Sequence, residues 1–181
     1  MESYALLMAA TLNAGTVLAL ASLGLLINEK AGIVNLGAEG MMLCAAIAGF
    51  AAVVHSGSDM VGFAAGIGAG ALLALIFGFL VIWLNTNQYA TGLAVSLFGA
   101  GFSAFVGISY VQARIPARPS FAIPYLADIP LLGPALFRHH PLVYLTVLLA
   151  LGLIWFLYRT RAGLVLRSVG ENPESAHALG Y

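Results

Sequence analysis

The chain has 181 residues, of which 61% are hydrophobic and 8% are charged, and its mean hydropathy is +0.99. A soluble domain carries roughly 25% charged residues, so this composition excludes an ordinary soluble domain and predicts an integral membrane protein. The formal net charge is zero and no basic run exists, which argues against nucleic acid as a partner. The single cysteine, Cys44, cannot form an intrachain disulfide.

Five apolar stretches follow one another, each close to the roughly 20 helical residues that cross a bilayer core. We expect spans near residues 5–27, 33–54, 60–84, 89–112 and 141–158. The predicted fold class is therefore an all-α integral membrane protein, with a polytopic helix bundle over residues 1–158 and a polar tail over 159–181. The chain start lacks the basic residues of a signal peptide, so the first stretch is expected to remain as a span.

The segment between the first and second spans is unusual for a lipid-facing helix. Residues 31–40 contain three glycines, together with Asn35 and Glu39. If this segment is helical throughout, Glu39 lies about 12 Å along the helix from Ala31. An ionisable group at such a depth normally faces a bundle interior or a water-filled cavity. Glu39 therefore either lines a polar path or is a structural carboxylate at a helix break, and both readings stay open.

The third and fourth spans carry small residues at every fourth position. The third has Gly62, Gly66, Gly70, Ala74 and Gly78, and the fourth has Gly92, Ser96, Ala100 and Ala104. Spacing of four places each row on one helix face, so that backbones can approach closely in lipid. The rows predict a tight bundle. Thr91 and Ser96 are also polar groups that either line a pathway or form hydrogen bonds between helices.

The stretch 113–140 separates the fourth and fifth spans. Six of the seven prolines lie between Pro116 and Pro141, so this loop is predicted to be extended or turn-rich, with a possible short helix at 131–137. His139 and His140 are read as solvated loop residues. No nucleophile elbow, metal-ligand spacing or phosphate loop occurs, so no catalytic or metal-binding residue is assigned. Active transport would then need a partner or an ion gradient.

The tail predicts one short helix, from Pro173 to about residue 179. Asn172 is a good N-cap, Pro173 suits the first helical position, and Glu174 complements the helix dipole. His177 falls in the last turn and Gly180 suits the position after the helix. A helix this short is unstable alone in water, so it must pack against something. That surface is either a soluble partner or the bilayer and the chain's own bundle.

Three segments, 32–42, 87–94 and 161–180, resemble permease subunits of ATP-binding-cassette importers. The matching branch handles branched-chain amino acids, ribose-type sugars and nucleosides. The forms Asn-Leu-Gly-Ala-Glu-Gly and Gln-Tyr-Ala-Thr-Gly-Leu-Ala are most similar to the nucleoside (simple-sugar) subgroup. The resemblance implies a permease of a binding-protein-dependent importer in a bacterial-type plasma membrane. Such permeases run to about 300 residues, so the chain is expected to be C-terminally truncated.

The resemblance also implies roles and partners. The segment 161–180 matches the cytoplasmic coupling loop, whose short helix contacts an ATPase subunit; the residues at that contact would be Glu171, Asn172, Pro173, Glu174 and His177. ATP would bind to the ATPase subunit, and this chain would bind no cofactor directly. A second permease subunit, expected to be a paralogue, and an extracytoplasmic binding protein complete the assembly, with loop 113–140 as landing surface. Arg161 and Arg167 would hold the segment at the inner membrane surface.

A cytoplasmic C-terminus agrees with the distribution of positive charge. It places Lys30, Arg159, Arg161 and Arg167 inside, against Arg114, Arg118 and Arg138 outside. An odd number of spans then puts the N-terminus outside. The pathway candidates are Asn35, Glu39, Thr91 and Ser96. The alternative from another class is an ion-coupled secondary transporter or channel subunit that uses Glu39 and needs no ATPase.

Overall fold

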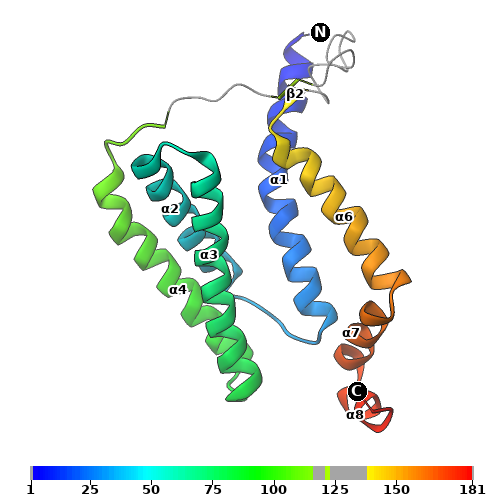
Figure 1. The fold of residues 1–181 in the computed structure, drawn as a ribbon. Coiled ribbons are helices and arrows are strands. Elements are labelled where there is room, and N and C mark those ends of the chain that lie inside the picture. The colour runs from blue at the N-terminus through cyan, green and yellow to red at the C-terminus, as the bar shows by residue number, and fades with distance from the viewer. Residues whose placement is uncertain (1, 116–120, 123–137, 181) are drawn as a thin grey trace. The chain divides into compact units, whose positions relative to one another are not determined.

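A computed structural model gives the fold of residues 2–115, 121–122 and 138–180 (Figure 1). The chain forms two compact units: the first unit joins Met1–Gly32 with Arg118–Tyr181, and the second unit is Ile33–Ala117. The described residues include five helices that are long and apolar enough to cross a membrane. This confirms the predicted class, an all-α polytopic membrane bundle.

The second unit is a three-helix bundle. It contains α2 (Ala38–Ser56), α3 (Asp59–Gly78) with its π-helical end η1 (Phe79–Trp83), and α4 (Gln88–Gly107) with its 3-10 end η2 (Ile108–Tyr110). The predicted second span began at 33, but α2 begins at Ala38. The reason is local: Asn35 and Gly37 make a turn, described below, which keeps residues 33–37 out of the helix.

Glycines set the spacing of this bundle, as the small-residue rows predicted. Gly62 and Gly66 of α3 lie against α2; a Cβ atom on Gly66 would lie 3.1 Å from the carbonyl oxygen of Ala45. On α4, Gly99 lies against the backbone of Gly40. The rows are not uniform, because a Cβ atom on Gly78 would meet no heavy atom within 4 Å in the described part of the chain. Close approach of this kind lets helices associate through dispersion contacts, because in lipid there is no hydrophobic driving force between helices.

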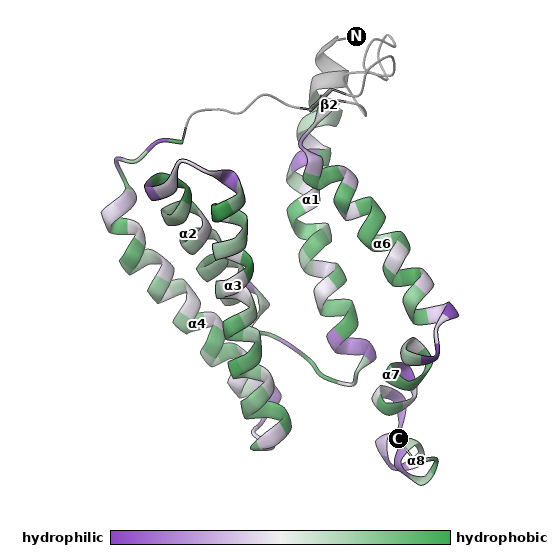
Figure 2. Cartoon of the chain, viewed as in Figure 1, coloured by the Kyte–Doolittle hydropathy of each residue, from purple (hydrophilic) through white to green (hydrophobic). Residues whose placement is uncertain are grey.

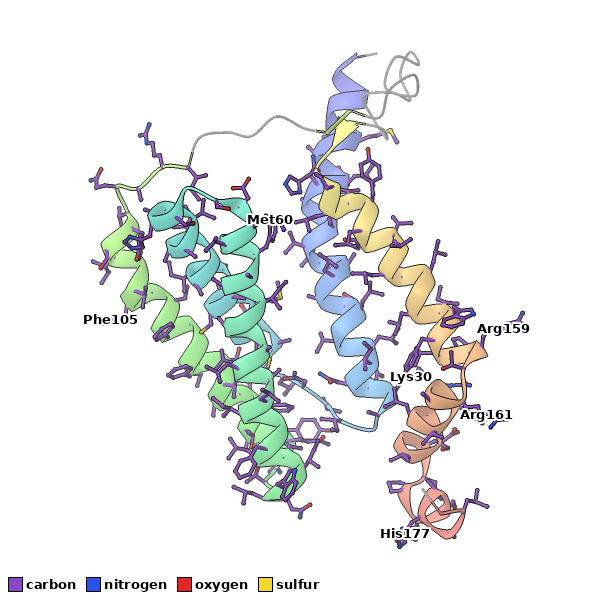
Figure 3. The ribbon with its side chains drawn as sticks, in the orientation of Figure 1. Lys30, Met60, Phe105, Arg159, Arg161 and His177 are labelled. Atoms are coloured by element: carbon purple, nitrogen blue, oxygen red, sulfur yellow. The ribbon has the colours of Figure 1, made fainter. Side chains whose placement is uncertain are left out.

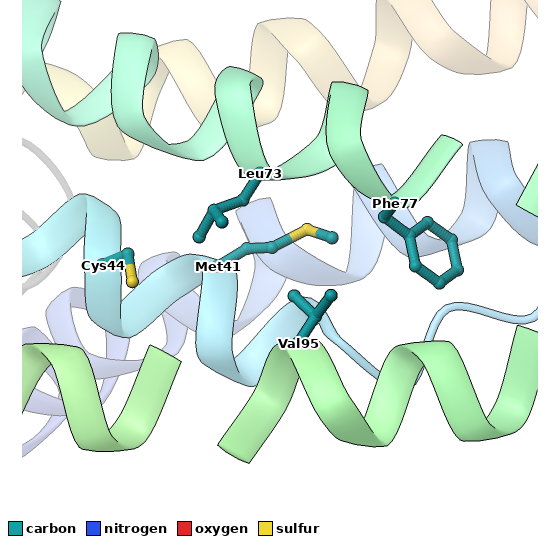
Figure 4. Packing of buried hydrophobic residues seen from close by; sticks show 5 residues of the cluster. All are labelled: Met41, Cys44, Leu73, Phe77 and Val95. Atoms are coloured by element: carbon teal, nitrogen blue, oxygen red, sulfur yellow. The ribbon is translucent and has the colours of Figure 1, made fainter. Parts of the chain in front are cut away.

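A small core fills the centre of the second unit. Figure 4 shows Met41 and Cys44 of α2 packed between Leu73 and Phe77 of α3 and Val95 of α4; all five side chains are buried. The outer faces of the helices are apolar as well (Figure 2). A surface so rich in large apolar side chains needs lipid or further protein around it.

The first unit contains α1 (Glu2–Lys30), α6 (Pro141–Arg159), α7 (Arg161–Glu171) and α8 (Pro173–Ala178), with α1 packed against α6 and α7. A two-residue antiparallel pair, β1 (Phe121–Ala122) with β2 (Arg138–His139), lies within the loop that was predicted to be extended. The short helix considered at 131–137 lies outside the described residues.

The helix α7 was not predicted. Thr160 caps it: its Oγ1 accepts a hydrogen bond from the Gly163 amide at 3.0 Å and donates one to the Phe156 carbonyl at 2.6 Å. The sequence held the signal, because a threonine precedes a stretch in which polar Arg161, Arg167 and Ser168 alternate with apolar residues at helical spacing. The tail is therefore two helices in series.

Candidate functional site

In the C-terminal segment, residues 160–180, the chain changes direction after α6 and then forms two short helices, α7 and α8. At the end of α6, Gly163 lies directly on the backbone of Phe156 and Leu157; a Cβ atom at Gly163 would lie 2.7 Å from the Leu157 Cα. Leu157 beneath it is 2% exposed. Together with the Thr160 cap, this contact fixes how α7 leaves the fifth span.

The last helix, α8, has the caps that its sequence predicted. The Asn172 side-chain oxygen accepts a hydrogen bond from the Ser175 amide at 3.0 Å, and Pro173 occupies the first turn. Gly180 has a φ of +88°, the left-handed conformation that follows many helices. A helix of six residues holds its shape here because these caps satisfy its ends.

Only one side of α8 is covered by the chain. Ala176 is 2% exposed, whereas the five predicted contact residues all remain exposed on this short stretch: Glu171, Asn172, Pro173, Glu174 and His177. His177 is labelled in Figure 3. The five residues thus lie exposed within the stretch 171–177, which carries two carboxylates.

The two arginines of α7 differ in their surroundings. Arg161 is exposed (Figure 3), as a residue at a membrane surface would be. Arg167 is half-buried, with its guanidinium carbon 4.7 Å from the centre of the Tyr158 ring. Its Nε is buried and has no hydrogen-bond partner among the residues that the structure describes. Arg167 therefore has a partner within the chain, and this cation–π contact ties α7 to the last turn of α6.

Asn35 and Glu39 flank the turn that leads into α2. The Asn35 Oδ1 accepts a hydrogen bond from the Gly37 amide at 2.9 Å, and its Nδ2 lies 3.8 Å from the Met41 sulfur. Glu39 is exposed in the first turn of α2, where its charge complements the helix dipole. The depth of 12 Å considered for Glu39 does not apply, because it assumed a helix through residues 31–40.

Thr91 and Ser96 lie on α4, which packs against this turn. The Thr91 hydroxyl is 2.9 Å from the Thr86 hydroxyl, so it bonds within its own end of the helix. Ser96 is half-buried, and its backbone lies against Gly40. The two elements are also joined by the Val34 amide, which donates to the Gln88 side-chain oxygen at 3.0 Å.

The four pathway candidates thus come from two segments that pack on each other within the second unit. Among the described residues, no hydrogen bond joins any two of the four side chains. The small-residue row of the fourth span contained Gly92, but the sequence did not indicate that this glycine packs on the turn 33–37. A Cβ atom on Gly92 would lie 2.9 Å from the Leu36 amide nitrogen, and one on Gly37 would lie 3.1 Å from the Gly92 carbonyl oxygen.

Among the described residues, five helices long and apolar enough to cross a membrane, followed by two short helices, define a multi-pass membrane protein. Residues 7–181 match the family model described as branched-chain amino acid transport system / permease component. The chain belongs to this family.

Three curated relatives of the chain have names that are consistent with this family. A candidate glucose ABC transporter permease protein of Haloferax volcanii is 44% identical over 96% of this chain, and a guanosine ABC transporter permease protein of Bacillus subtilis is 33% identical over 99%. A nucleoside ABC transporter permease protein of Lactococcus lactis is 30% identical over 91%. The chain covers 54%, 60% and 56% of these proteins, respectively. No solved structure matches the chain.

Proposed function

We propose that the chain is part of a permease subunit of a binding-protein-dependent, ATP-driven importer. It would carry a small polar solute, a nucleoside or a related sugar, across the plasma membrane. The family match supports the transport role, and the names of the three relatives (glucose, guanosine and nucleoside permeases) support a solute that is or contains a sugar.

One observation carries the proposal: the exposed surface of α8. The helix is capped at both ends, and both Glu174 in its first turn and Glu171 at the end of α7 are exposed. Among the described residues of α8, Ala176 alone is buried against the chain. A soluble ATPase subunit would bind this surface. Coulombic attraction between the two carboxylates and basic groups of the ATPase would favour binding and make it weaker at high salt.

The proposed assembly places the chemistry outside this chain. ATP would bind and be hydrolysed on the ATPase, and this chain would bind no cofactor itself. A second permease subunit, a paralogue, would complete the path, and an extracytoplasmic binding protein would deliver the solute to loop 113–140. Docking of a cytoplasmic ATPase to α8 requires a cytoplasmic C-terminus, so the N-terminus would lie outside after five spans.

Within the bundle, Asn35, Glu39, Thr91 and Ser96 are proposed to lie near the solute path. The support is that the turn 33–37 and the first turns of α4 pack together through glycines and the bond between Val34 and Gln88. Irregular backbone at membrane depth is tolerated where it is buried in protein or lines a water-filled cavity.

The test reverses the charges of Glu171 and Glu174, which flank the start of α8. In Glu171→Lys/Glu174→Lys, recovery of the ATPase with the purified permease and solute uptake should both be lost, while the protein remains in the membrane. The matched control is Asp59→Lys, at the start of α3 and, by span count, on the other membrane face. This control should retain the ATPase. If the double variant recovers as much ATPase as the unchanged chain, α8 is not the docking surface.

A further inference from the structure

Two glycines of α7 rest on the backbones of two different helices. Gly163 lies against Phe156 and Leu157 at the end of α6, and Gly170 lies against the residues that end α1. A Cβ atom at Gly170 would lie 2.8 Å from the Ala31 carbonyl carbon and 2.8 Å from the Gly32 amide nitrogen. Residues seven apart share a helix face, so both contacts lie on the same side of α7.

The contact at Gly32 is close from its own side as well. A Cβ atom at Gly32 would lie 3.0 Å from the Gly170 carbonyl oxygen and 3.1 Å from the Gly170 Cα. Gly32 also has a φ of +80°, a conformation that glycine adopts without strain and that follows the end of a helix. The Gly32 amide donates to the Glu29 carbonyl at 3.0 Å, which closes the last turn of α1.

We propose that Gly32 and Gly170 are positioning residues that transmit movement of the C-terminal segment to the end of α1. This inference rests on the proposed function, and it names the path by which a docked ATPase would act on the bundle. A backbone-to-backbone contact has no side chain that can change rotamer, so a displacement of α7 cannot be absorbed at the contact. The end of α1 and α7 then move as one body.

The covalent chain extends this path. Gly32 is followed directly by residues 33–37, the turn that holds Asn35 and leads into α2. A shift of the α1 end therefore acts on the turn at which the proposed path residues begin. At the C-terminal end of α7, the single residue Asn172 connects it to α8. Within α8, Ala176 is buried against the chain. A force on α8 is thus delivered to α7.

The first test substitutes the contact. In the permease purified with its ATPase, Gly170→Ala should leave the ATPase bound but lower solute uptake per ATP hydrolysed by about two- to thirtyfold, the range expected for changed coupling between sites. Gly170→Val should lower it further. The matched control is Gly24→Ala in α1, where a Cβ atom would meet no described residue within 4 Å. Uptake per ATP in Gly170→Ala equal to that of the control overturns the inference.

The second test needs no substitution at the contact. Spin labels at Glu29→Cys and Leu164→Cys, both exposed positions, report the distance between the end of α1 and α7 once the single native cysteine is removed by Cys44→Ala. The distance distribution should be the same in the nucleotide-free and ATP-trapped states. A distribution that shifts between these states shows that the two elements move separately and overturns the inference.

The failure of this inference can be told from failure of the proposed function. If no ATPase is recovered with the unchanged permease, the proposed function fails and neither test is reached. If the ATPase is recovered and drives uptake, but Gly170→Ala keeps its full uptake per ATP, only the proposed route fails.

Discussion

Gly40 of α2 packs directly on Ser96 of α4: a Cβ atom at Gly40 would lie 2.6 Å from the Ser96 Cα. The carbonyl oxygens of Val95 and Ser96 border the same spot, so the neighbours are backbone atoms that cannot turn aside. This contact sets the distance between the two helices that carry the proposed path residues.

Gly40→Ala should therefore destabilise the second unit. Forcing one extra carbon into a packed contact costs about 1–3 kcal/mol, and here the helices must separate to admit it. The measurement is the unfolding midpoint of the purified chain in detergent. Gly101→Ala, on the facing helix α4, would place a Cβ atom with nothing within 4 Å among the described residues. It should be neutral or stabilising because alanine is the better helix former. Equal stability of the two variants would contradict the close packing.

Thr160→Ala should loosen the junction of α6 and α7. The substitution removes the acceptor for the Gly163 amide and the donor to the Phe156 carbonyl, and loss of an N-cap costs about 1 kcal/mol. Hydrogen exchange of the α7 amides should rise accordingly. Thr160→Ser keeps the hydroxyl and should exchange like the unchanged chain; faster exchange in the serine variant would assign the effect to the lost methyl group.

Asn172→Ala should weaken ATPase binding without touching the exposed carboxylates. It removes the acceptor for the Ser175 amide, and a cap worth about 1 kcal/mol lowers the population of folded α8 and so the affinity by roughly fivefold. Affinity of the purified permease for its ATPase measures this. Asn172→Asp retains a capping oxygen and should keep more affinity than Asn172→Ala. Equal affinity of the alanine variant and the unchanged chain would show that α8 need not be helical to dock.

Glu39→Gln separates the ATP-driven importer from an ion-coupled transporter. Glu39 is exposed in the first turn of α2 and makes no hydrogen bond or ion pair within the described residues, so its loss should cost less than about 1 kcal/mol of stability. Uptake by the variant should still require ATP, and its rate should not change when ion gradients are collapsed. An ion-driven component of uptake that is present in the unchanged chain and absent in Glu39→Gln would favour the ion-coupled class.

The parts of the fold that depend on neighbours in sequence could be predicted. Apolar length predicted five span helices, and Asn172, Pro173 and Gly180 predicted α8 with its caps, because capping acts within a single turn. The start of α2 was misplaced, since the side-chain bond from Asn35 to the Gly37 amide competes with helix formation and hydropathy does not register it.

Contacts between distant segments could not be predicted in the same way. The glycine rows indicated which faces are small, but not that Gly40 meets Ser96 or that Gly32 meets Gly170, because one sequence does not specify which helices pair. The helix α7 was missed although its signals, the Thr160 cap and the helical spacing of its apolar residues, are local. Its arginines were read as surface anchors, whereas Arg167 packs on Tyr158 and stabilises a helix that follows the span directly.

The central claim, that this chain serves an ATP-driven importer, is tested most directly by uptake into vesicles that contain the permease and its ATPase. With its binding protein and a nucleoside or sugar outside, accumulation should require hydrolysable ATP within and should persist when ionophores collapse all ion gradients. Accumulation that proceeds without ATP and stops when an ion gradient is collapsed would contradict the account.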